Sequence, residues 1–353
     1  MKLLFPIIFI IILHCSCEEL PEMKPIEPKT GKGLFILNQG NFQFSNSSLS
    51  YYDPGLNQIQ NNVFQRANKG IPLGDVAQSM VIYDSLAFIV LNNSGGVYVI
   101  DINTFVFKGW IEGLTSPRYI HIINEQKGYI TDLYAKAITI FNPTNLEITG
   151  RITTDKGSNI FNQHATEQMV QVNNLIYTNC WSFDDKILII DSDLDKVVDS
   201  INVGIQPVAI KLDKNNKLWV LTDGGYVGNP FGHEEAKLVC INLQNKAIER
   251  EFIFELNDRP TDLQMNGTKD TLYFVNNDIW KLSIEQRSMP EKPFIPRDNK
   301  LFYALGVDPF TSEVYVSDAI DYMQSGKVYR FSPQAAPIDT FTVGITPGYF
   351  CFK

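Results

Sequence analysis

Short apolar runs that end at a turn recur from Gly33 to the C-terminus of the chain. Each run contains aromatic or β-branched residues followed by Asp, Asn or Ser, a pattern typical of a strand that leads into a turn. The runs are LSYYDP, VYVIDI, ITIFNP, ILIIDS, LVCINL, WKLSIE and VYRFSP. Their polar residues, spaced 41 to 51 positions apart, are Asp53, Asp101, Asn142, Asp191, Asn242, Ser283 and Ser332. Seven units of this length predict a seven-bladed β-propeller.

Three further strands complete each predicted unit. A second strand precedes each run, as in GLFILNQ, LIYTNCW and KLWVLTD, and a fourth follows it, as in FVFKGWI and KVVDSIN. A first strand starts after Pro in several units, as in SPRYIHI and QPVAIKL. No stretch has a helical period, so we expect an all-β fold of four-stranded blades. The C-terminal TPGYFCFK is predicted to supply the first strand of the N-terminal blade and so close the ring.

The sequence divides into three predicted segments: a lipoprotein signal peptide at 1–16, a flexible tether at 17–32 and the propeller domain at 33–353. The apolar run from Leu3 to Leu13 is too short to cross a membrane and is typical of an export signal. Ser16 precedes the expected lipid acceptor Cys17, with Cys15 as the other candidate. An ordinary cleaved secretion signal is the alternative interpretation of this segment.

Composition narrows the ligand class. The chain has 353 residues, a net charge of −9 and 20% charged residues, which is typical of a globular soluble body. This acidic balance argues against nucleic acid and strongly acidic polysaccharides as partners and favours a neutral ligand. The four histidines lack paired metal-ligand spacing, and no G-x-S-x-G motif is present. We therefore predict neither a metal site nor a cofactor, and no catalytic motif.

The connections after the second strands form the predicted site. Every unit ends its second strand with Asn or Asp, at Asn38, Asn92, Asp132, Asn179, Asp223, Asn277 and Asp318. These residues are either plain turn formers or members of a rim around the central channel. Their connections also carry aromatic residues and are longer than a hairpin requires, as ligand-binding loops often are. The predicted ligand-binding residues are Asn41, Phe42, Asp132, Tyr134, Asn179, Trp181, Asp223, Tyr226, Asn277, Asp318 and Tyr322.

Several segments resemble those of the YncE-like propeller lipoproteins of Gram-negative gut bacteria, and most of all the cobalamin-binding lipoproteins of the BtuG type. These segments include GLFILNQGNF, YTNCWSFDDKILIIDSDLDKVVDSINVGIQP, KLWVLTDGGYVGNPFG and DPFTSEVYVSDAIDYMQSGKVYRFSP. The resemblance implies a lipid-anchored protein on the outer face of the outer membrane. It also implies capture of cobalamin (vitamin B12) or related corrinoids and their transfer to a TonB-dependent transporter of the BtuB type.

Two other functions stay open at this stage. The first is a propeller that binds a neutral glycan or another bulky nutrient through the same aromatic and amide rim. The second is a hydrolase with a metal in the channel, which would need Glu, Asp and Asn gathered on the first strands. No channel Glu is evident in the sequence, so we expect a binding protein rather than an enzyme.

Overall fold

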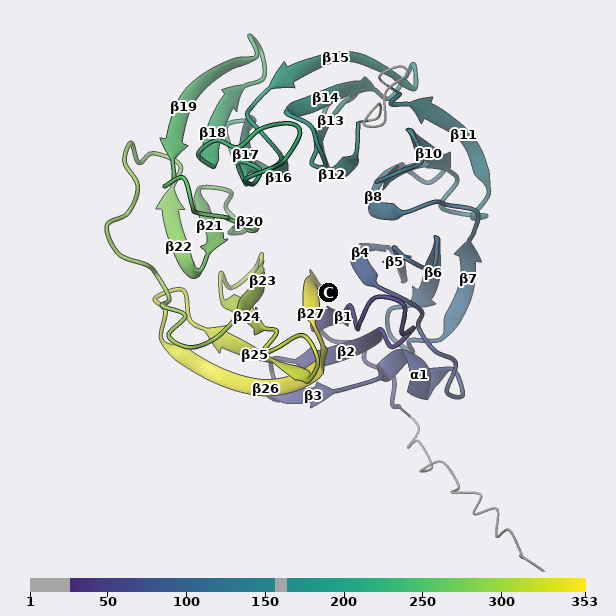
Figure 1. Cartoon of the computed structure of the whole chain (residues 1–353). Coiled ribbons are helices and arrows are strands. Elements are labelled where there is room, and N and C mark those ends of the chain that lie inside the picture. The colour runs from purple at the N-terminus through teal and green to yellow at the C-terminus, as the bar shows by residue number, and fades with distance from the viewer. Residues whose placement is uncertain (1–25, 156–163) are drawn as a thin grey trace, which may run out of the picture.

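Seven β-sheets stand radially around a central opening (Figure 1). The computed structural model describes residues 26–155 and 164–353, which form 27 strands and one short helix. Each sheet is antiparallel and runs from an inner strand at the opening to an outer strand at the rim (Figure 1). The predicted seven-bladed all-β propeller is confirmed.

The first four blades contain four strands each, named from the inner to the outer strand. Blade 1 is β27 (Pro347–Phe352), β1 (Leu34–Asn38), β2 (Ser48–Asp53) and β3 (Gln58–Gln60). Blade 2 is β4 (Ala77–Tyr83), β5 (Leu86–Leu91), β6 (Gly96–Asp101) and β7 (Phe107–Ile111). Blade 3 is β8 (Pro117–Asn124), β9 (Lys127–Asp132), β10 (Ala137–Phe141) and β11 (Ile148–Thr153). Blade 4 is β12 (Thr166–Val172), β13 (Leu175–Cys180), β14 (Lys186–Asp191) and β15 (Lys196–Asn202).

The remaining blades follow the same order. Blade 5 is β16 (Pro207–Leu212), β17 (Lys217–Thr222), β18 (Lys237–Asn242) and β19 (Ala247–Ile253). Blade 6 is β20 (Asp262–Met265), β21 (Thr271–Asn276) and β22 (Asp278–Ser283). Blade 7 is β23 (Phe302–Val307), β24 (Val314–Asp318), β25 (Ser325–Phe331) and β26 (Pro337–Ile345).

Blade 6 departs from the expected four strands, because its sheet contains three. The chain after β22 carries Pro290, Pro293 and Pro296, and each proline lacks the N–H that a strand ladder needs. Ile295 still returns to the blade: its carbonyl accepts a hydrogen bond from Ile279 N at 3.0 Å. An irregular segment therefore occupies the outer position of this blade.

The ring closes within blade 1, as predicted. β27 pairs antiparallel with β1, from Leu34 opposite Phe352 to Asn38 opposite Pro347. Beyond the ladder, Lys353 N donates to the carbonyl of Gly33 at 2.8 Å. The first and last strands of the domain thus share one sheet, which leaves no open seam between the two ends of the chain.

The hydrophobic core consists of seven separate clusters rather than one. Each cluster fills the space between two neighbouring blades. For example, Phe35 of blade 1 packs with Ile89 of blade 2, and Tyr315 of blade 7 packs with Leu34 of blade 1. Both faces of a blade are therefore apolar, and polar side chains are left for the channel, the two faces of the disc and the outer rim.

One short helix, α1 (Val63–Ala67), lies in the connection between blades 1 and 2, with Val63 and Phe64 buried. Five residues are too few to show a helical period, which explains its absence from the prediction. Within the described ranges, no helix has the length and apolarity needed to cross a bilayer.

Part of the expected tether lies on the propeller. Ile26 packs against the cluster between blades 1 and 2, and Lys29 N donates to Asn103 O at 2.8 Å. Lys32 lies 4.1 Å from the centroid of the Phe310 ring. Residues 26–32 of the expected tether therefore contact the domain, and residues 17–25 lie outside the described residues. The predicted signal peptide (1–16) and Cys17 lie outside the described residues.

Candidate ligand-binding site

The two faces of the disc differ in the connections they carry. We call the mouth face the one that carries the loops joining the second and third strands of each blade, such as 39–47, 133–136, 181–185, 223–236 and 319–324. We call the other the turn face, because its connections are mostly short turns such as 125–126 and 213–216. This division follows from the alternating direction of four antiparallel strands, and it confirms the predicted placement of the long loops on one face.

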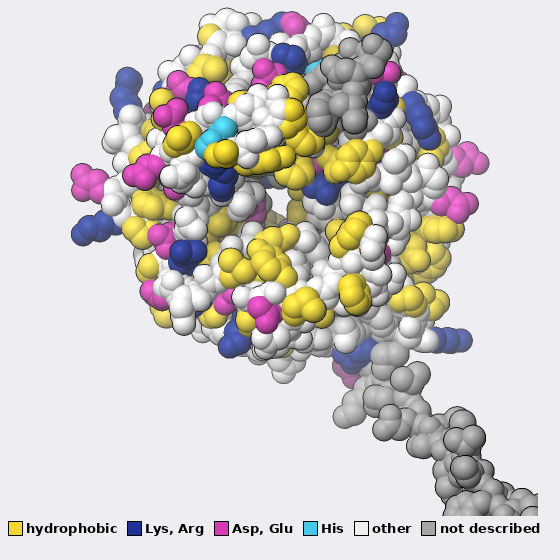
Figure 2. Space-filling view, in the orientation of Figure 1, with side chains coloured by type: hydrophobic (Ala, Val, Ile, Leu, Met, Phe, Trp, Pro, Cys, Tyr) yellow, Lys and Arg dark blue, Asp and Glu magenta, His cyan; other side chains and the backbone are white. Residues whose placement is uncertain are grey.

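A cavity of about 470 Å³ occupies the centre of the ring. Most of its walls come from the inner strands β8, β12, β16, β20, β23 and β27, with further contributions from residues of the mouth-face loops. Its polar lining residues are Gln39, Gln78, Arg118, Tyr119, Glu167, Gln168, Trp181, Lys211, Asp223, Arg259, Thr261, Asp262, Gln264, Tyr303 and Tyr349. The cavity is open to solvent, as the hollow at the centre of the face in Figure 2 shows.

A register shift near the start of the inner strand shapes this lining in six of the seven blades. In β8, Pro117 pairs with Asp132 but the next pair is Ile120 with Ile130. A regular strand would point Arg118 and Tyr119 to opposite faces, whereas the irregularity allows both to line the cavity. The same shift in β12 turns two consecutive residues, Glu167 and Gln168, toward it.

Arg118 links three blades at the cavity wall. Its Nε lies 2.8 Å from Glu167 Oε1, and its Nη1 donates to Gln78 Oε1 at 2.7 Å. Burial raises the pKa of Glu167, and the nearby guanidinium counteracts part of that rise. Glu167 is buried on an inner strand, so the expectation that no glutamate lies in the channel is wrong.

A second polar group lies on the opposite side of the cavity. Asp262 accepts hydrogen bonds from Leu305 N at 2.9 Å and from Gln264 Nε2 at 3.0 Å. Burial raises the pKa of Asp262, while the charge of Lys211 lowers it. Burial also raises the pKa of Tyr119 to about 12, so this phenol stays protonated at neutral pH. The cavity wall thus presents both hydrogen-bond donors and hydrogen-bond acceptors in fixed positions.

The charges around the cavity balance. The lining contains three cationic side chains, Arg118, Lys211 and Arg259, and three carboxylates, Glu167, Asp223 and Asp262. An equal number of charges of each sign gives no strong preference for an anion or a cation. This lining fits the neutral ligand that the composition favours.

Trp181 and Asp223, two of the predicted residues, meet at the mouth of the cavity. The indole Nε1 donates to Asp223 Oδ2 at 3.1 Å, and both residues line the cavity. Asp223 also accepts from Gly225 N at 2.8 Å and from Gln206 Nε2 at 3.1 Å. Burial raises the pKa of Asp223, and these donors counteract the rise. The indole of blade 4 is therefore held in place by a carboxylate of blade 5.

Exposed aromatic side chains surround this mouth. Four predicted residues, Phe42, Tyr134, Tyr226 and Tyr322, are 61%, 59%, 49% and 43% exposed. Further exposed apolar residues of the mouth-face connections are Phe44, Ile71, Val227, Phe231, Leu256, Ile320 and Met323. Figure 2 shows hydrophobic side chains on several sides of the central hollow. We call these eleven residues the apolar rim; exposed apolar groups gathered on one face commonly mark an interaction site.

Three of the predicted rim residues are buried and hold the fold. Asp132 accepts hydrogen bonds from four backbone N–H groups, those of Thr115, Ser116, Tyr134 and Ala135. Asp318 likewise accepts from Leu301 N at 3.0 Å and Ile320 N at 2.9 Å.

Asn179 is fully buried and donates to the carbonyl of Pro207 in the next blade at 2.6 Å. These three side chains are not exposed on the rim: Asp132 and Asp318 fit the turn-forming interpretation, and Asn179 joins two blades.

The last two predicted residues lie at the surface. Asn41 Nδ2 donates to the carbonyl of Tyr322 at 2.6 Å, which connects the loops of blades 1 and 7. Asn277 is exposed, and its Oδ1 accepts from Arg297 Nη1 at 3.1 Å. The structure thus brings Trp181 with Asp223 and Asn41 with Tyr322, while Asn277 forms a separate contact near blade 6.

The prediction missed the lining of the inner strands. A usable signal is present in the sequence: short strands that begin at or near Pro contain charged or amide residues, as in PRYIHI, PVAIKL and PTDLQM. Charged groups are rarely placed in the centre of a β-domain unless they are paired or face a cavity.

Comparisons with known proteins agree with the fold. A family described as a domain of unknown function, DUF5074, matches residues 32–342. No curated protein sequence gives a significant match. The chain is similar in structure to a quinonprotein alcohol dehydrogenase-like protein from Bacteroides thetaiotaomicron, with TM-score 0.71, 15% identity, and coverage of 92% of this chain and 79% of the other.

Two further solved structures are similar. One is the periplasmic gluconolactonase PpgL of Pseudomonas aeruginosa, with TM-score 0.67, 9% identity, and coverage of 91% and 99%. The other is the dihydro-heme d1 dehydrogenase NirN in complex with DHE, with TM-score 0.60, 8% identity, and coverage of 93% and 77%. At these identities the likeness concerns the fold alone.

Proposed function

Because the chain belongs to the DUF5074 family, whose description assigns no activity, we propose a function from the geometry of its mouth face. The protein binds cobalamin or a related corrinoid, without catalysis, across the mouth of the central cavity. The observation that carries this proposal is the apolar rim around a charge-balanced polar cavity. A corrin is a broad, largely apolar ring edged with neutral amides, so both parts of the site have a counterpart on the ligand.

The size of the cavity determines how such a ligand would sit. A corrinoid is too large to enter a volume of about 470 Å³ completely. Its ring would rest on aromatic side chains such as Tyr134, Tyr226 and Tyr322, and one substituent would enter the cavity beside Trp181. Each aromatic contact adds about 0.5–1.5 kcal/mol beyond area burial, so several together are enough for tight binding.

The wider biological role follows from the same proposal. The protein is anchored to the outer membrane through lipid on Cys17, is exposed at the cell surface, and passes its ligand to a TonB-dependent transporter of the BtuB type. The basis for this part is the N-terminal sequence together with the resemblance to propeller lipoproteins.

Calorimetric titration of the purified chain with cyanocobalamin tests the binding. We expect saturation at one ligand per chain. Trp181→Ala, Tyr134→Ala and Tyr226→Ala should each weaken binding roughly 2- to 12-fold, the equivalent of about 0.5–1.5 kcal/mol. Trp110→Ala is the matched control, because Trp110 is an exposed tryptophan on the outer strand β7. Unchanged affinity in the Trp181, Tyr134 and Tyr226 variants would place the ligand elsewhere. The absence of any binding heat with cyanocobalamin would favour a neutral glycan as the ligand.

Hydrolysis is the second candidate, and the position of Glu167 in the cavity is the observation that favours it. A general acid or base must be able to reach the substrate, and Glu167 lines the cavity but is paired with Arg118 at 2.8 Å. Incubation with simple sugar lactones, followed by titration of released acid, tests this activity. Turnover that is lost in Glu167→Gln would replace the binding proposal by an enzymatic one.

A further inference from the structure

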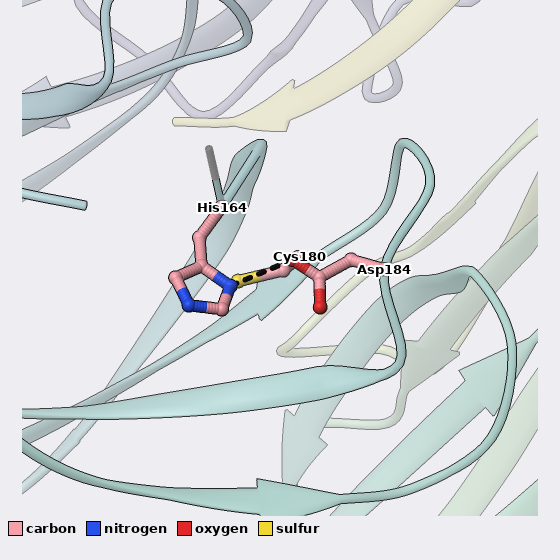
Figure 3. Close-up of side chains that lie close together, drawn as sticks. All are labelled: His164, Cys180 and Asp184. Atoms are coloured by element: carbon pink, nitrogen blue, oxygen red, sulfur yellow. Dashed lines mark hydrogen bonds and ion pairs between the residues drawn. The ribbon is translucent and has the colours of Figure 1, made fainter. Parts of the chain in front are cut away.

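Three side chains with metal-ligating atoms converge in blade 4, outside the central cavity. They are His164 before β12, Cys180 at the end of β13 and Asp184 in the following loop (Figure 3). His164 Nδ1 lies 2.7 Å from Asp184 Oδ2, and the three ligand atoms all lie within 4.8 Å of one another. Cys180 and Asp184 are fully buried, and 16% of the His164 side chain is exposed. The cluster has no signature in the sequence, because its residues are 16 and 4 positions apart on different elements.

The backbone around the cluster is fixed by hydrogen bonds on every side. His164 N donates to Thr154 O at 2.9 Å, and Trp181 N donates to Ala165 O at 3.0 Å. The carbonyl of Asp184 accepts from Gln206 N at 2.8 Å, which connects the loop to blade 5. A binding site built on such a fixed frame needs little rearrangement to take its ligand.

We propose that His164, Cys180 and Asp184 bind a zinc ion. Zinc accepts imidazole nitrogen, thiolate sulfur and carboxylate oxygen, at about 2.0–2.3 Å. A tetrahedral arrangement at those lengths separates ligand atoms by about 3.3–3.8 Å. The His164–Asp184 pair at 2.7 Å therefore has to open by about 0.6 Å or more, and any separation near the 4.8 Å limit has to close by up to about 1 Å. Three protein ligands leave the fourth position to water or to a donor atom of another molecule.

The orientation of the imidazole distinguishes a metal site from a nucleophilic triad. In a triad, one ring nitrogen faces the carboxylate and the other faces the nucleophile. Figure 3 shows the Nδ1 edge of His164 turned toward both Cys180 and Asp184, while Nε2 points away from them. Because one nitrogen faces both partners, the three groups converge on a shared point. A zinc ion at that point takes the place of the proton between His164 Nδ1 and Asp184, which moves to Nε2 or to water, and displaces the thiol proton of Cys180 to water.

The proposed zinc site also bears on the mouth of the cavity. Trp181 lies between Cys180 and Asp184 in sequence, and its indole lines the cavity. A metal that joins both ends of this five-residue stretch fixes the position of Trp181. Zinc binding itself is independent of corrinoid binding, so the two proposals stand or fall separately.

Equilibrium dialysis of the purified chain against zinc chloride, followed by metal analysis, tests the site. We expect one zinc per chain for the wild type and loss of that zinc in His164→Gln, Cys180→Ser and Asp184→Asn. Cys240→Ser is the matched control, because Cys240 is another buried thiol, located on β18 of blade 5. This variant should keep its zinc. Circular dichroism confirms the fold of each variant.

Cobalt provides a second measurement that does not depend on the variants folding. Addition of cobalt chloride to the wild-type chain should give a thiolate-to-cobalt charge-transfer band and the visible bands of a tetrahedral ion, both displaced by zinc. Less than one zinc per chain, or zinc that persists in the Cys180→Ser variant, would overturn the proposal. A cobalt spectrum without the thiolate band would do so as well.

Discussion

At the scale of single residues, Asn179 and Asn277, both expected at the ends of second strands, have different surroundings in blades 4 and 6. Asn179 is fully buried and donates to Pro207 O in the next blade, as Asn92 does to Pro117 O. Asn277 is exposed and contacts a surface arginine. Asn179 lies within β13, opposite Ile187, and makes an inter-blade contact, whereas Asn277 follows β21 at a surface bend.

This difference predicts different effects of substitution on stability. Asn179→Ala removes the side-chain donor to Pro207 O, and we expect it to lower the unfolding free energy by about 1–3 kcal/mol. Asn277→Ala should change it by about 0.5 kcal/mol or less. Urea denaturation of both variants measures the two values. Equal effects would show that burial at the Asn179 position does not matter.

The burial of His121 should make the unfolding free energy depend on pH. It lies on β8 with Nε2 2.7 Å from Gln171 Oε1; burial lowers its pKa, and this contact raises it by less. As the pH falls, the unfolded chain takes up the imidazole proton before the folded chain does. The stability that depends on neutral His121 is therefore complete above about pH 6.5 and is lost as the pH falls toward the lower folded pKa.

The His121→Gln variant isolates this contribution. The difference in unfolding free energy between wild type and variant should shrink as the pH falls from about 7 to 5, by at most about 1.4 kcal/mol per pH unit. Denaturation curves at several pH values measure it. Curves that stay parallel would show that the folded and unfolded pKa values of His121 are equal.

At the scale of strands, β27 alone joins the end of the chain to its beginning. Phe350 is buried in the cluster between blades 7 and 1. Phe350→Ala should lower the unfolding free energy by about 3–5 kcal/mol, because it empties a packed site. The exposed Phe310 on the turn face is the control, and Phe310→Ala should cost about 1 kcal/mol or less.

Removal of the whole strand predicts a different defect. A chain that ends at Thr346 leaves the inner edge of β1 without its partner, and open edges pair with other molecules. We expect oligomers or aggregates in size-exclusion chromatography. A monomeric, cooperatively folded product would mean that closure by β27 is dispensable.

The strands were predictable from the sequence because each alternates or runs apolar between strong turn signals. The bulged starts of the inner strands were not, since a register shift depends on how two strands pair in space. This is why Arg118 and Glu167 were missed although both lie in predicted strands or beside them. The predicted fourth strand of blade 6 does not form, for a local reason: three prolines follow β22.

At the scale of the whole molecule, the seven-fold repeat was predictable because every blade must bury both of its faces against neighbours. The site was predictable only in part. Exposure of Phe42, Tyr134, Tyr226 and Tyr322 follows from their long loops, whereas Asp132, Asn179 and Asp318 turn inward to satisfy backbone groups. Sequence spacing alone does not show which of these side chains are exposed and which are buried.

The N-terminal segment gives a prediction at this scale. Deletion of residues 26–32 removes the packing of Ile26 and the hydrogen bond from Lys29 to Asn103. The unfolding free energy should fall by about 1–2 kcal/mol, because Ile26 is partly buried and a fully buried aliphatic side chain contributes about 1.5–3 kcal/mol. Affinity for cyanocobalamin should not change, since these residues contact the turn face. A parallel loss of affinity would connect the segment to the ligand site.

The path of residues 26–32 also shows from which face of the disc the chain enters the propeller. They contact Asn103 and Phe310, which lie in connections of the turn face, and the chain then enters β1 from that side. Under the proposed anchoring through Cys17, the described chain would leave the disc on the turn face, opposite the cavity mouth. Transfer to the proposed transporter in the same membrane would then require the propeller to turn its mouth face toward that membrane, or the transporter to reach over the disc.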